Sequence, residues 1–460
     1  MKKENRTLST SEILSYATGG IFINLAGACD QYGMYFMTNV ALLPAGIVGA
    51  MLMCCTVFDA INDPIIGSMA DQNQSRIGKY RPFLIIGGLI LCASSIFRFV
   101  VPDCGQTGKI VYYMLFLCMY SIGFTACNIP WNTMMSVLTS NYHERNILLS
   151  VKTISSNFIG MLVGVILINC VTALGGNADG GWWKFSLIAW IIALPFIYVC
   201  QNGMKRVDYK NSIPSPPKRS FFRAFIHILS YQPILCLCLA MLLSSMVSTM
   251  MNSSELYFYE YILKDTSVLA KTSAWGFPVT IGSAMLIPIF LKYIDKRIAI
   301  VAAFAVCMIK PIFIFLFGSS LNSSTVIVLI VISKAGMALQ AAALYAWIPE
   351  CVDWTNYKDG AASAGLVNAS MTFTMKLGRA LGQSAAGTFM HLADFQANTA
   401  ISNAVTVQIL NINGLYPIIG LCLSIIPILF FPISRKKAAE IREILKNRET
   451  VLTKSNTQES

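Results

Sequence analysis

Long apolar segments alternate with short polar segments along nearly the whole chain. Each apolar segment is close to the roughly 20 residues that an α-helix needs to cross the hydrocarbon core of a bilayer. Repeated in this way, the pattern predicts an all-α membrane protein. We expect twelve transmembrane helices, at residues 13–39, 42–70, 83–101, 109–138, 148–173, 182–202, 233–262, 268–292, 298–317, 323–349, 361–390 and 408–433.

The composition also favours a membrane protein. Of the 460 residues, 55% are hydrophobic and only 12% are charged, and a soluble protein of this size cannot bury so much apolar surface. The net charge of +12 comes mainly from lysines and arginines in alternate loops, which mark the cytoplasmic side of a membrane protein. We therefore expect a multi-pass protein with both termini in the cytoplasm, embedded in the lipid bilayer and with no nucleic acid partner.

The longest polar interruption between apolar segments is at residues 205–223, which are rich in Pro, Ser and Lys. It separates six apolar segments from six. The arrangement predicts two six-helix bundles, at residues 1–204 and 224–433, joined by a cytoplasmic linker and followed by a cytoplasmic tail at residues 434–460. This is also the layout of major-facilitator transporters.

The 14 cysteines and three histidines give no sign of a metal centre. Most cysteines lie inside apolar segments, no CxxC pair is present, and three histidines are few for a metal site. We interpret the cysteines as small buried hydrophobic residues. Because no nucleophile–base pair is visible either, we expect no enzyme activity and no cofactor.

Charges inside a membrane are costly and usually functional, and the second predicted helix carries two of them. Asp59 and Asp63 lie about one helical turn apart, on a stripe that also includes Thr56 and Gly67. Carboxylates this close either share a proton or hold a cation between them. The alternative is a polar helix end that lies in water.

The fourth predicted helix has a polar face formed by Ser121, Thr125, Asn128 and Asn132. The Thr125 hydroxyl and the two aspartates provide the oxygen ligands that suit a hard cation such as Na⁺. The two asparagines have an equally good alternative, because amide side chains commonly form hydrogen bonds between membrane helices.

The eleventh predicted helix places two cationic side chains on one polar face. This face should line a water-filled cavity, because contact with lipid is costly for a charge. Arg98 and Lys310 are not candidates for the site, since long basic side chains also reach an interface from within a membrane. The polar face consists of Gly365, Asn368, Thr372, Lys376, Arg379 and Gln383, and further intramembrane charges are Asp30, Lys152, Glu255, Glu260 and Lys334.

Two consecutive motifs cover the second predicted helix and the hairpin after it. They are D-A-I-N-D-P-x-x-G at residues 59–67 and D-x-x-x-x-R-x-G-K-x-R-P at residues 71–82. N-I-P-W at residues 128–131, E-R at 144–145 and E-C-V-D-W at 350–354 accompany them. Together these motifs resemble the glycoside–pentoside–hexuronide:cation symporters of the major facilitator superfamily, to which melibiose permease belongs.

The resemblance implies a cation site for Na⁺ or H⁺ formed by Asp59, Asp63 and Thr125. Asn62 and Ser121 occupy positions at which family members with different coupling ions vary. The resemblance also implies a location in the bacterial inner (cytoplasmic) membrane and a sugar site between the bundles, near helices 1, 4, 5 and 11. The candidate sugar-binding residues are Asn24, Asp30, Asn128, Trp131, Asn132, Lys152, Thr372, Lys376 and Arg379.

The chain departs from melibiose permease at the two acidic sugar ligands, whose positions hold Asn24 and Asn128. Lys152, Lys376 and Arg379 add positive charge around the expected cavity. Because guanidinium and ammonium groups bind carboxylates well, an acidic glycoside or uronide fits better than a neutral galactoside. In the alternative, Lys376 pairs with the helix-2 aspartates and its charge is already neutralised.

The basic hairpin after the second helix is expected to form a cytoplasmic gate, whose ion pairs break as the bundles move. It also serves as a positive-inside anchor, and the two roles are compatible. The candidate gate residues are Asp71, Arg76, Lys79, Arg81, Glu144, Arg145 and Asp353.

Taken together, these features predict a monomeric symporter that imports a sugar, glycoside or hexuronide by alternating access, driven by Na⁺ or H⁺. An ion-coupled transporter of an amphipathic lipid is the alternative among transporters. A membrane sensor would usually carry a large soluble output domain, and the polar segments here are short. A membrane enzyme would need a catalytic cluster.

Overall fold

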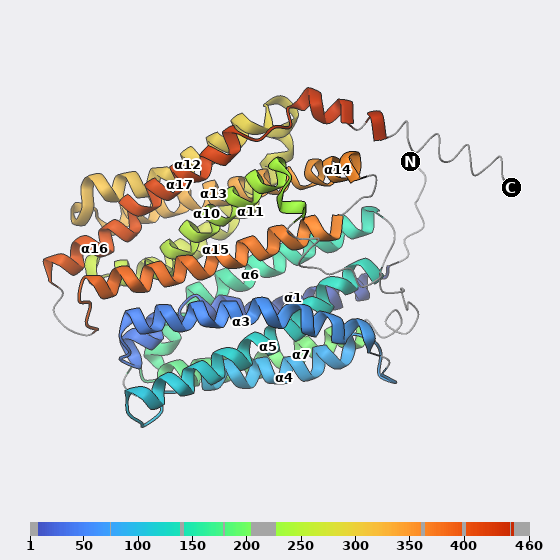
Figure 1. Ribbon diagram of the computed structural model, residues 1–460. Coiled ribbons are helices and arrows are strands. Elements are labelled where there is room, and N and C mark those ends of the chain that lie inside the picture. The colour runs from blue at the N-terminus through green and yellow to red at the C-terminus, as the bar shows by residue number, and fades with distance from the viewer. Residues whose placement is uncertain are drawn as a thin grey trace, which may run out of the picture.

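The computed structural model describes residues 8–73, 75–138, 142–177, 180–203, 227–359, 364–397, 402–441 and 443–445, and every regular element among them is a helix (Figure 1). In chain order these are α1 (Thr10–Asp30), α2 (Gly33–Tyr35), η1 (Phe36–Val40), α3 (Ala45–Gln72), α4 (Arg81–Phe97), α5 (Gln106–Leu138), α6 (Tyr142–Ala173), α7 (Gly181–Gly203), α10 (Gln232–Tyr257), η2 (Phe258–Ile262), α11 (Ser267–Tyr293), α12 (Lys296–Phe317), η3 (Gly318–Ser320), α13 (Ser323–Tyr345), α14 (Ile348–Asp359), α15 (Ala364–Leu392), α16 (Asn403–Asn413) and α17 (Leu415–Leu429).

These helices confirm the expected all-α membrane fold. Each of the predicted apolar segments overlaps a helix. Within the described ranges, eight spans are long and apolar enough to cross a membrane. The amphipathic helix α15 is not among them, because its polar face lowers its hydropathy. The number of helices that cross the bilayer therefore stays a prediction.

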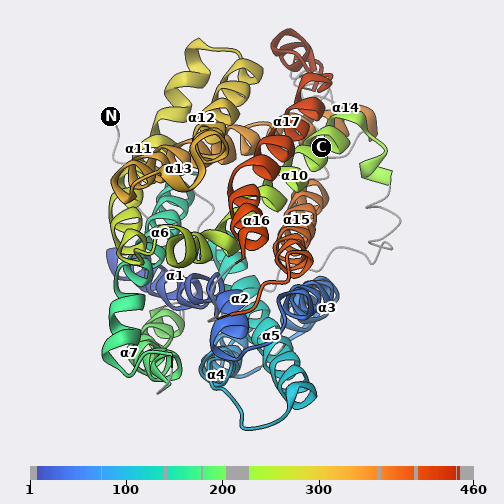
Figure 2. The same ribbon diagram turned by 90° about the vertical axis from the view of Figure 1, so that its left-hand side faces the viewer.

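The helices pack in two sets, which follow each other along the chain (Figures 1 and 2). In the first set α1 packs on α6 and α7, α4 packs on α5 and α7, and α3 packs on α5. In the second set α10 packs on α15 and α17, α12 packs on α13 and α17, and α11 packs on α13. The sets meet where α3 contacts α15 and where α6 contacts α11. The expected linker at residues 205–223 lies outside the described residues, so the bundle boundaries stay a prediction.

Glycines bring α3 and α15 close together. A Cβ atom on Gly387 would lie 2.6 Å from the carbonyl oxygen of Ala45, and one on Gly49 would lie 3.2 Å from the Cα of Gly387. Small residues allow close approach of membrane helices in this way. The two helices run in opposite directions, and Asp59 and Lys376 lie about 15 and 16.5 Å along their helices from this contact, at about 1.5 Å per residue. Both side chains are therefore held at the same depth.

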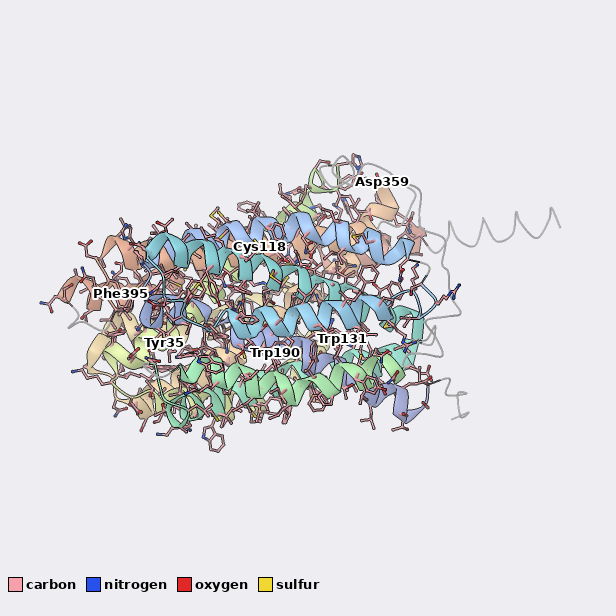
Figure 3. All side chains as sticks on the ribbon, turned by 90° about the horizontal axis from the view of Figure 1, so that it is seen from below. Tyr35, Cys118, Trp131, Trp190, Asp359 and Phe395 are labelled. Atoms are coloured by element: carbon pink, nitrogen blue, oxygen red, sulfur yellow. The ribbon has the colours of Figure 1, made fainter. Side chains whose placement is uncertain are left out.

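The two ends of the molecule can be told apart by their side chains. Tyr35 and Phe395 lie toward one end, here named the Tyr35 end, and Asp359 lies toward the opposite, Asp359 end (Figure 3). The Tyr257 ring contacts both Tyr35 and Phe395, with centroid distances of 5.5 Å in each case. Aromatic side chains thus join the two sets of helices at the Tyr35 end.

A π-helical turn follows α2 as η1 and α10 as η2, where the sequence analysis expected continuous α-helices at residues 13–39 and 233–262. Side chains in and next to these turns also form hydrogen bonds between the two sets of helices. Thr38 Oγ1 and Tyr257 OH share a hydrogen bond of 2.5 Å, and Asn39 Nδ2 donates to Tyr261 OH at 2.8 Å and to Glu260 Oε2 at 3.4 Å. Such π-turns often occur at functional positions. The five residues that form these hydrogen bonds between the two sets are here named the Tyr35-end seal: Thr38, Asn39, Tyr257, Glu260 and Tyr261.

Candidate functional site

The two aspartates of α3 face hydroxyl groups from α5. Ser121 Oγ donates to Asp59 Oδ1 at 2.6 Å. Thr125 Oγ1 lies 3.1 Å from Asp59 Oδ1 and 2.9 Å from Asp63 Oδ1. A hydroxyl has one proton, so Thr125 donates to one carboxylate at a time. These contacts bring together four of the five predicted cation-site residues.

Lys376 of α15 completes the cluster from the other set of helices. Its Nζ atom lies 2.7 Å from Asp59 Oδ2 and also contacts Asp63 Oδ2. The exposed fractions are 15% for Lys376, 18% for Asp59 and 27% for Asp63, so water screens these ion pairs only in part. Of the two roles considered for Lys376, the geometry matches the pairing with the aspartates.

The cluster has the chemistry of a site for a small hard cation. Two carboxylates against one ammonium leave one negative charge uncompensated, and the nearby donors are carboxylate and hydroxyl oxygens, which hard cations prefer. No group of three or more His, Cys, Asp or Glu side chains suited to a metal ion occurs in the described part of the chain. The hydroxyls of Ser121 and Thr125 are in contact with the two carboxylates and add oxygen ligands to them.

Asn62 and Thr56 do not join the cluster. Asn62 is 8% exposed, and its Nδ2 atom has no hydrogen-bond partner among the described residues. Thr56 Oγ1 donates to the backbone oxygen of Leu52 at 3.0 Å. No contact between Asn62 and the aspartate cluster among the described residues supports its predicted contribution to cation binding.

A second polar group lies farther along α5. Asn132 Nδ2 donates to the side-chain oxygen of Asn128 at 3.0 Å, and Lys152 Nζ donates to Asn132 Oδ1. The same ammonium lies 5.2 Å from the centroid of the Trp131 ring, a cation–π distance. Trp131 is 1% exposed and donates to the backbone oxygen of Tyr16 at 3.1 Å. Four of the predicted sugar-binding residues are therefore neighbours.

Two other predicted sugar-binding residues are bonded within their own helices. Asn24 Nδ2 donates to the carbonyl oxygen of Gly20 at 2.7 Å, and Thr372 Oγ1 donates to that of Asn368 at 3.0 Å. Each bond uses one donor hydrogen of the side chain, so the Asn24 amide oxygen and the Thr372 hydroxyl oxygen can still accept a hydrogen bond from a ligand.

Asp30 forms an ion pair with Arg98, at 2.5 Å between Oδ1 and Nη1. Arg98 is only 1% exposed, and its guanidinium carbon lies 4.4 Å from the centroid of the Tyr120 ring. The expectation that Arg98 reaches an interface was therefore wrong, because its charge is neutralised inside the bundle. Asp30 also lines a cavity of about 180 Å³ together with Asp59, Lys376 and Arg379.

A larger space lies beside α10, which the sequence analysis did not assign to the sugar site. A cavity of about 280 Å³ shares Arg379 with the cavity around Asp59. It borders a third cavity of about 410 Å³, with which it shares Asn252 and Met337. These volumes suit a small ligand. Spacings of three and four residues along α10 could have revealed the polar wall of these cavities, which includes Ser244, Ser245, Ser248, Thr249, Asn252 and Glu255.

The predicted gate residues lie toward the Asp359 end. Arg81 is 6% exposed, and its Nη2 donates to Gln201 Oε1 at 2.7 Å. Glu144 accepts from the backbone nitrogen of Leu8 at 3.2 Å. Asp353 is half-buried. The side chains of Asp71 and Arg145 lie outside the described residues, as does any ion pair that involves them.

The neighbouring basic residues and α14 complete this end. Arg76 is exposed, and Lys79 Nζ lies 5.2 Å from the centroid of the Tyr80 ring. The Tyr231 hydroxyl, just before α10, donates to Asp359 of α14. This hydrogen bond to a carboxylate raises the pKa of Tyr231 to about 12.

Comparisons with known proteins agree over most of the chain. The model of the family "MFS/sugar transport protein" matches residues 15–435. The glucuronide carrier protein homolog of Escherichia coli (strain K12) is 24% identical over 97% of this chain and 98% of its own. The isoprimeverose transporter of Lactiplantibacillus pentosus is 24% identical over 92% of this chain and 89% of its own. A crystal structure of a D-xylose–proton symporter has a similar fold, with a TM-score of 0.61 at 15% identity over 93% of this chain and 98% of that one.

Proposed function

The chain belongs to the MFS/sugar transport protein family, the glycoside–pentoside–hexuronide symporters, and on that premise we propose that it imports its substrate together with Na⁺ or H⁺. It is a multi-pass membrane transporter of a sugar or glycoside with the major-facilitator fold, and not an enzyme. The proposal concerns the coupling ion, the direction of transport and the substrate, which is a sugar, glycoside or hexuronide.

The single observation that carries the proposal is the cluster of Asp59, Asp63 and Lys376. The carboxylates come from one set of helices and the ammonium from the other. A cation that binds between the aspartates competes with Lys376 for the same oxygens. Its arrival therefore weakens a bond between α3 and α15, which gives cation binding a direct effect on how the two sets pack.

Substrate binding is coupled to the cation through the neighbouring cavities. The cavity around Asp59 shares Arg379 with the cavity beside α10. The cavity around Asp59 is lined by both sets of helices, so a substrate that extends into it contacts both sets and favours one of their arrangements. Linkage then requires that substrate and cation change each other's affinity by the same factor. The group formed by Asn128, Trp131, Asn132 and Lys152 provides further candidate contacts for the substrate.

We propose that the Asp359 end faces the cytoplasm of a bacterial cell. Arg76 and Lys79 lie in a turn at this end, and Arg81, Lys296 and Arg297 lie at the starts of α4 and α12. Basic residues concentrate in and next to cytoplasmic loops. In this orientation the Tyr35-end seal separates the cavities from the outside. The seal must open for uptake, while the basic hairpin after α3 acts as the inner gate.

Uptake into vesicles tests the proposal. The full chain is reconstituted in proteoliposomes, and accumulation of labelled methyl β-D-glucoside and methyl β-D-glucuronide is measured under an imposed gradient of Na⁺ or of H⁺. We expect uphill accumulation of at least one sugar with one of the two ions. Asp63→Asn should abolish this accumulation, and full activity of that variant would contradict the assignment of the cation site.

A further inference from the structure

A second cluster of charged side chains lies on α10, α12 and α13. Lys310 Nζ is 3.8 Å from Glu255 Oε1, and the two side chains are 4% and 17% exposed. Lys334 Nζ donates to the backbone oxygen of Thr272 at 3.2 Å, and it forms no ion pair with any residue that the structure describes. The cluster thus contains two ammonium groups and one carboxylate. Because Glu255 pairs with Lys310, the positive charge of Lys334 has no negative partner among the described residues.

Glu255 and Lys334 line the cavity of about 410 Å³. Its walls come from both sets of helices, because Ala28 of α1 and Gly160 of α6 line it as well. A Cβ atom on Gly160 would meet nothing within 4 Å, so α6 leaves open space there. A ligand in this cavity would contact both sets of helices.

A glycine on α11 makes room for the Lys334 side chain. A Cβ atom on Gly276 would lie 2.6 Å from Lys334 Cδ and 3.3 Å from Nζ. Gly276 lines the same cavity. Because Gly276 has no side chain, the stem of Lys334 lies against α11 and its ammonium borders the cavity.

We propose that the cavity around Lys334 binds the acidic group of the transported substrate, a carboxylate or a sulfonate. The proposal rests on the transport function proposed above. A charge-assisted bond to the ammonium would match the unpaired charge of Lys334. The sugar hydroxyls would then lie against Ser248, Thr249 and Asn252, in the adjoining part of the cavities.

The other cationic groups are less suited to an anion. Lys376 is neutralised by two aspartates, and Lys152 is bonded to Asn132. Arg379 has no ion pair among the described residues, but it shares a cavity with Asp59, and Asp59 and Asp63 carry one negative charge more than Lys376 compensates, which opposes an anion there. The anion is therefore better placed at Lys334.

The test compares matched acidic and neutral sugars. The full chain in proteoliposomes is assayed for uptake of methyl β-D-glucuronide, its C6-sulfonated analogue and methyl β-D-glucoside. We expect the wild type to prefer the acids. Lys334→Gln should lower the acid-to-neutral uptake ratio about tenfold or more, and Lys334→Arg should retain most of the preference. Lys271→Gln, the matched control, removes an exposed lysine of α11 that lines none of these three cavities, and it should leave the ratio near its wild-type value.

Several results separate this proposal from the transport function itself. Neutral uptake without acid uptake in the wild type would overturn the acidic subsite and leave the symporter intact. An unchanged ratio in Lys334→Gln would also overturn it, as would a larger loss of the ratio in a separate Arg379→Gln variant, which tests the rival cation of the neighbouring cavity. Absence of all sugar uptake under either ion gradient would instead contradict the proposed function.

A second variant covers the case in which Lys334→Gln does not fold. Glu255→Gln combined with Lys310→Met removes the buried ion pair as a unit and keeps Lys334. Removing both partners together avoids leaving one buried charge unpaired. The acid preference should persist in this double variant, and its loss would count against Lys334 as the anion ligand.

Discussion

Replacing Lys376 by methionine should tighten cation binding while it uncouples transport. In the wild type, a cation must displace the ammonium from Asp59 and Asp63. At 2.7 Å and an effective dielectric constant of about 20, one such contact is worth about 6 kcal/mol before desolvation. Buried pairs cost about 3–5 kcal/mol to break and exposed pairs about 0–1 kcal/mol.

With side chains 15–27% exposed, we expect a net value of about 2 kcal/mol, between these limits. Lys376→Met removes this competition, so the cation should bind roughly 30-fold more tightly, at 1.4 kcal/mol per factor of ten. Without the cation, two unpaired carboxylates remain and the variant should be less stable than the wild type. Uphill sugar accumulation should fall, because cation binding no longer breaks a bond between α3 and α15.

Thermal unfolding of the purified protein over a range of Na⁺ concentrations, and over a range of pH, measures the change in affinity, since a ligand of the folded state raises apparent stability. Lys152→Met is the matched control, because it removes a lysine whose partner is an amide, and its cation response should equal that of the wild type. A cation response of Lys376→Met that is unchanged or weaker than wild type would refute the competition between Lys376 and the cation.

Three further changes test the packing around the site and the seal. Gly387→Ala should lower the free energy of unfolding by about 1–3 kcal/mol, because the new Cβ meets the α3 backbone. Its control is Gly282→Ala, whose new Cβ would meet nothing within 4 Å and which should be neutral or stabilising in the same unfolding assay. Thr38→Val removes a hydrogen bond of the Tyr35-end seal that is worth about 1 kcal/mol, so the rate of hydrogen–deuterium exchange in η1 should rise about fivefold. An unchanged rate would mean that this bond does not hold the seal closed. Arg98→Gln should cost about 3 kcal/mol of unfolding free energy by leaving Asp30 unpaired, and adding Asp30→Asn should restore part of it; additive losses in the double variant would contradict the pairing.

The fold and the contacts between Asp59, Asp63 and Thr125 at the candidate cation site could be predicted, because both follow from local periodicity. The apolar segments required helices, and Asp59 and Asp63 share one helical face at one depth. Thr125 could be assigned because polar groups of neighbouring membrane helices seek each other. The pairing of Lys376 with the aspartates stayed one of two alternatives, since it depends on how closely Gly49 and Gly387 let α3 approach α15.

Other features depend on tertiary packing and could not be read from periodicity. Arg98 and Asp30 are far apart in the sequence, and only the packing of the helices shows that the arginine is buried. Asn24 and Thr372 bond to their own backbones, an option that their spacing does not exclude. The unmatched charge of Lys334 follows from distances on three helices, although the polar face of α10 beside it was visible in the sequence.

The most direct test of the central claim is a measurement of binding linkage on the purified protein. Calorimetric titration with the transported sugar is made with and without a saturating concentration of the coupling ion, and the ion is titrated with and without the sugar. We expect each ligand to raise the other's affinity by the same factor, and Asp63→Asn to abolish this effect. Sugar affinity that is independent of Na⁺ and of pH in the wild type would contradict cation-coupled transport.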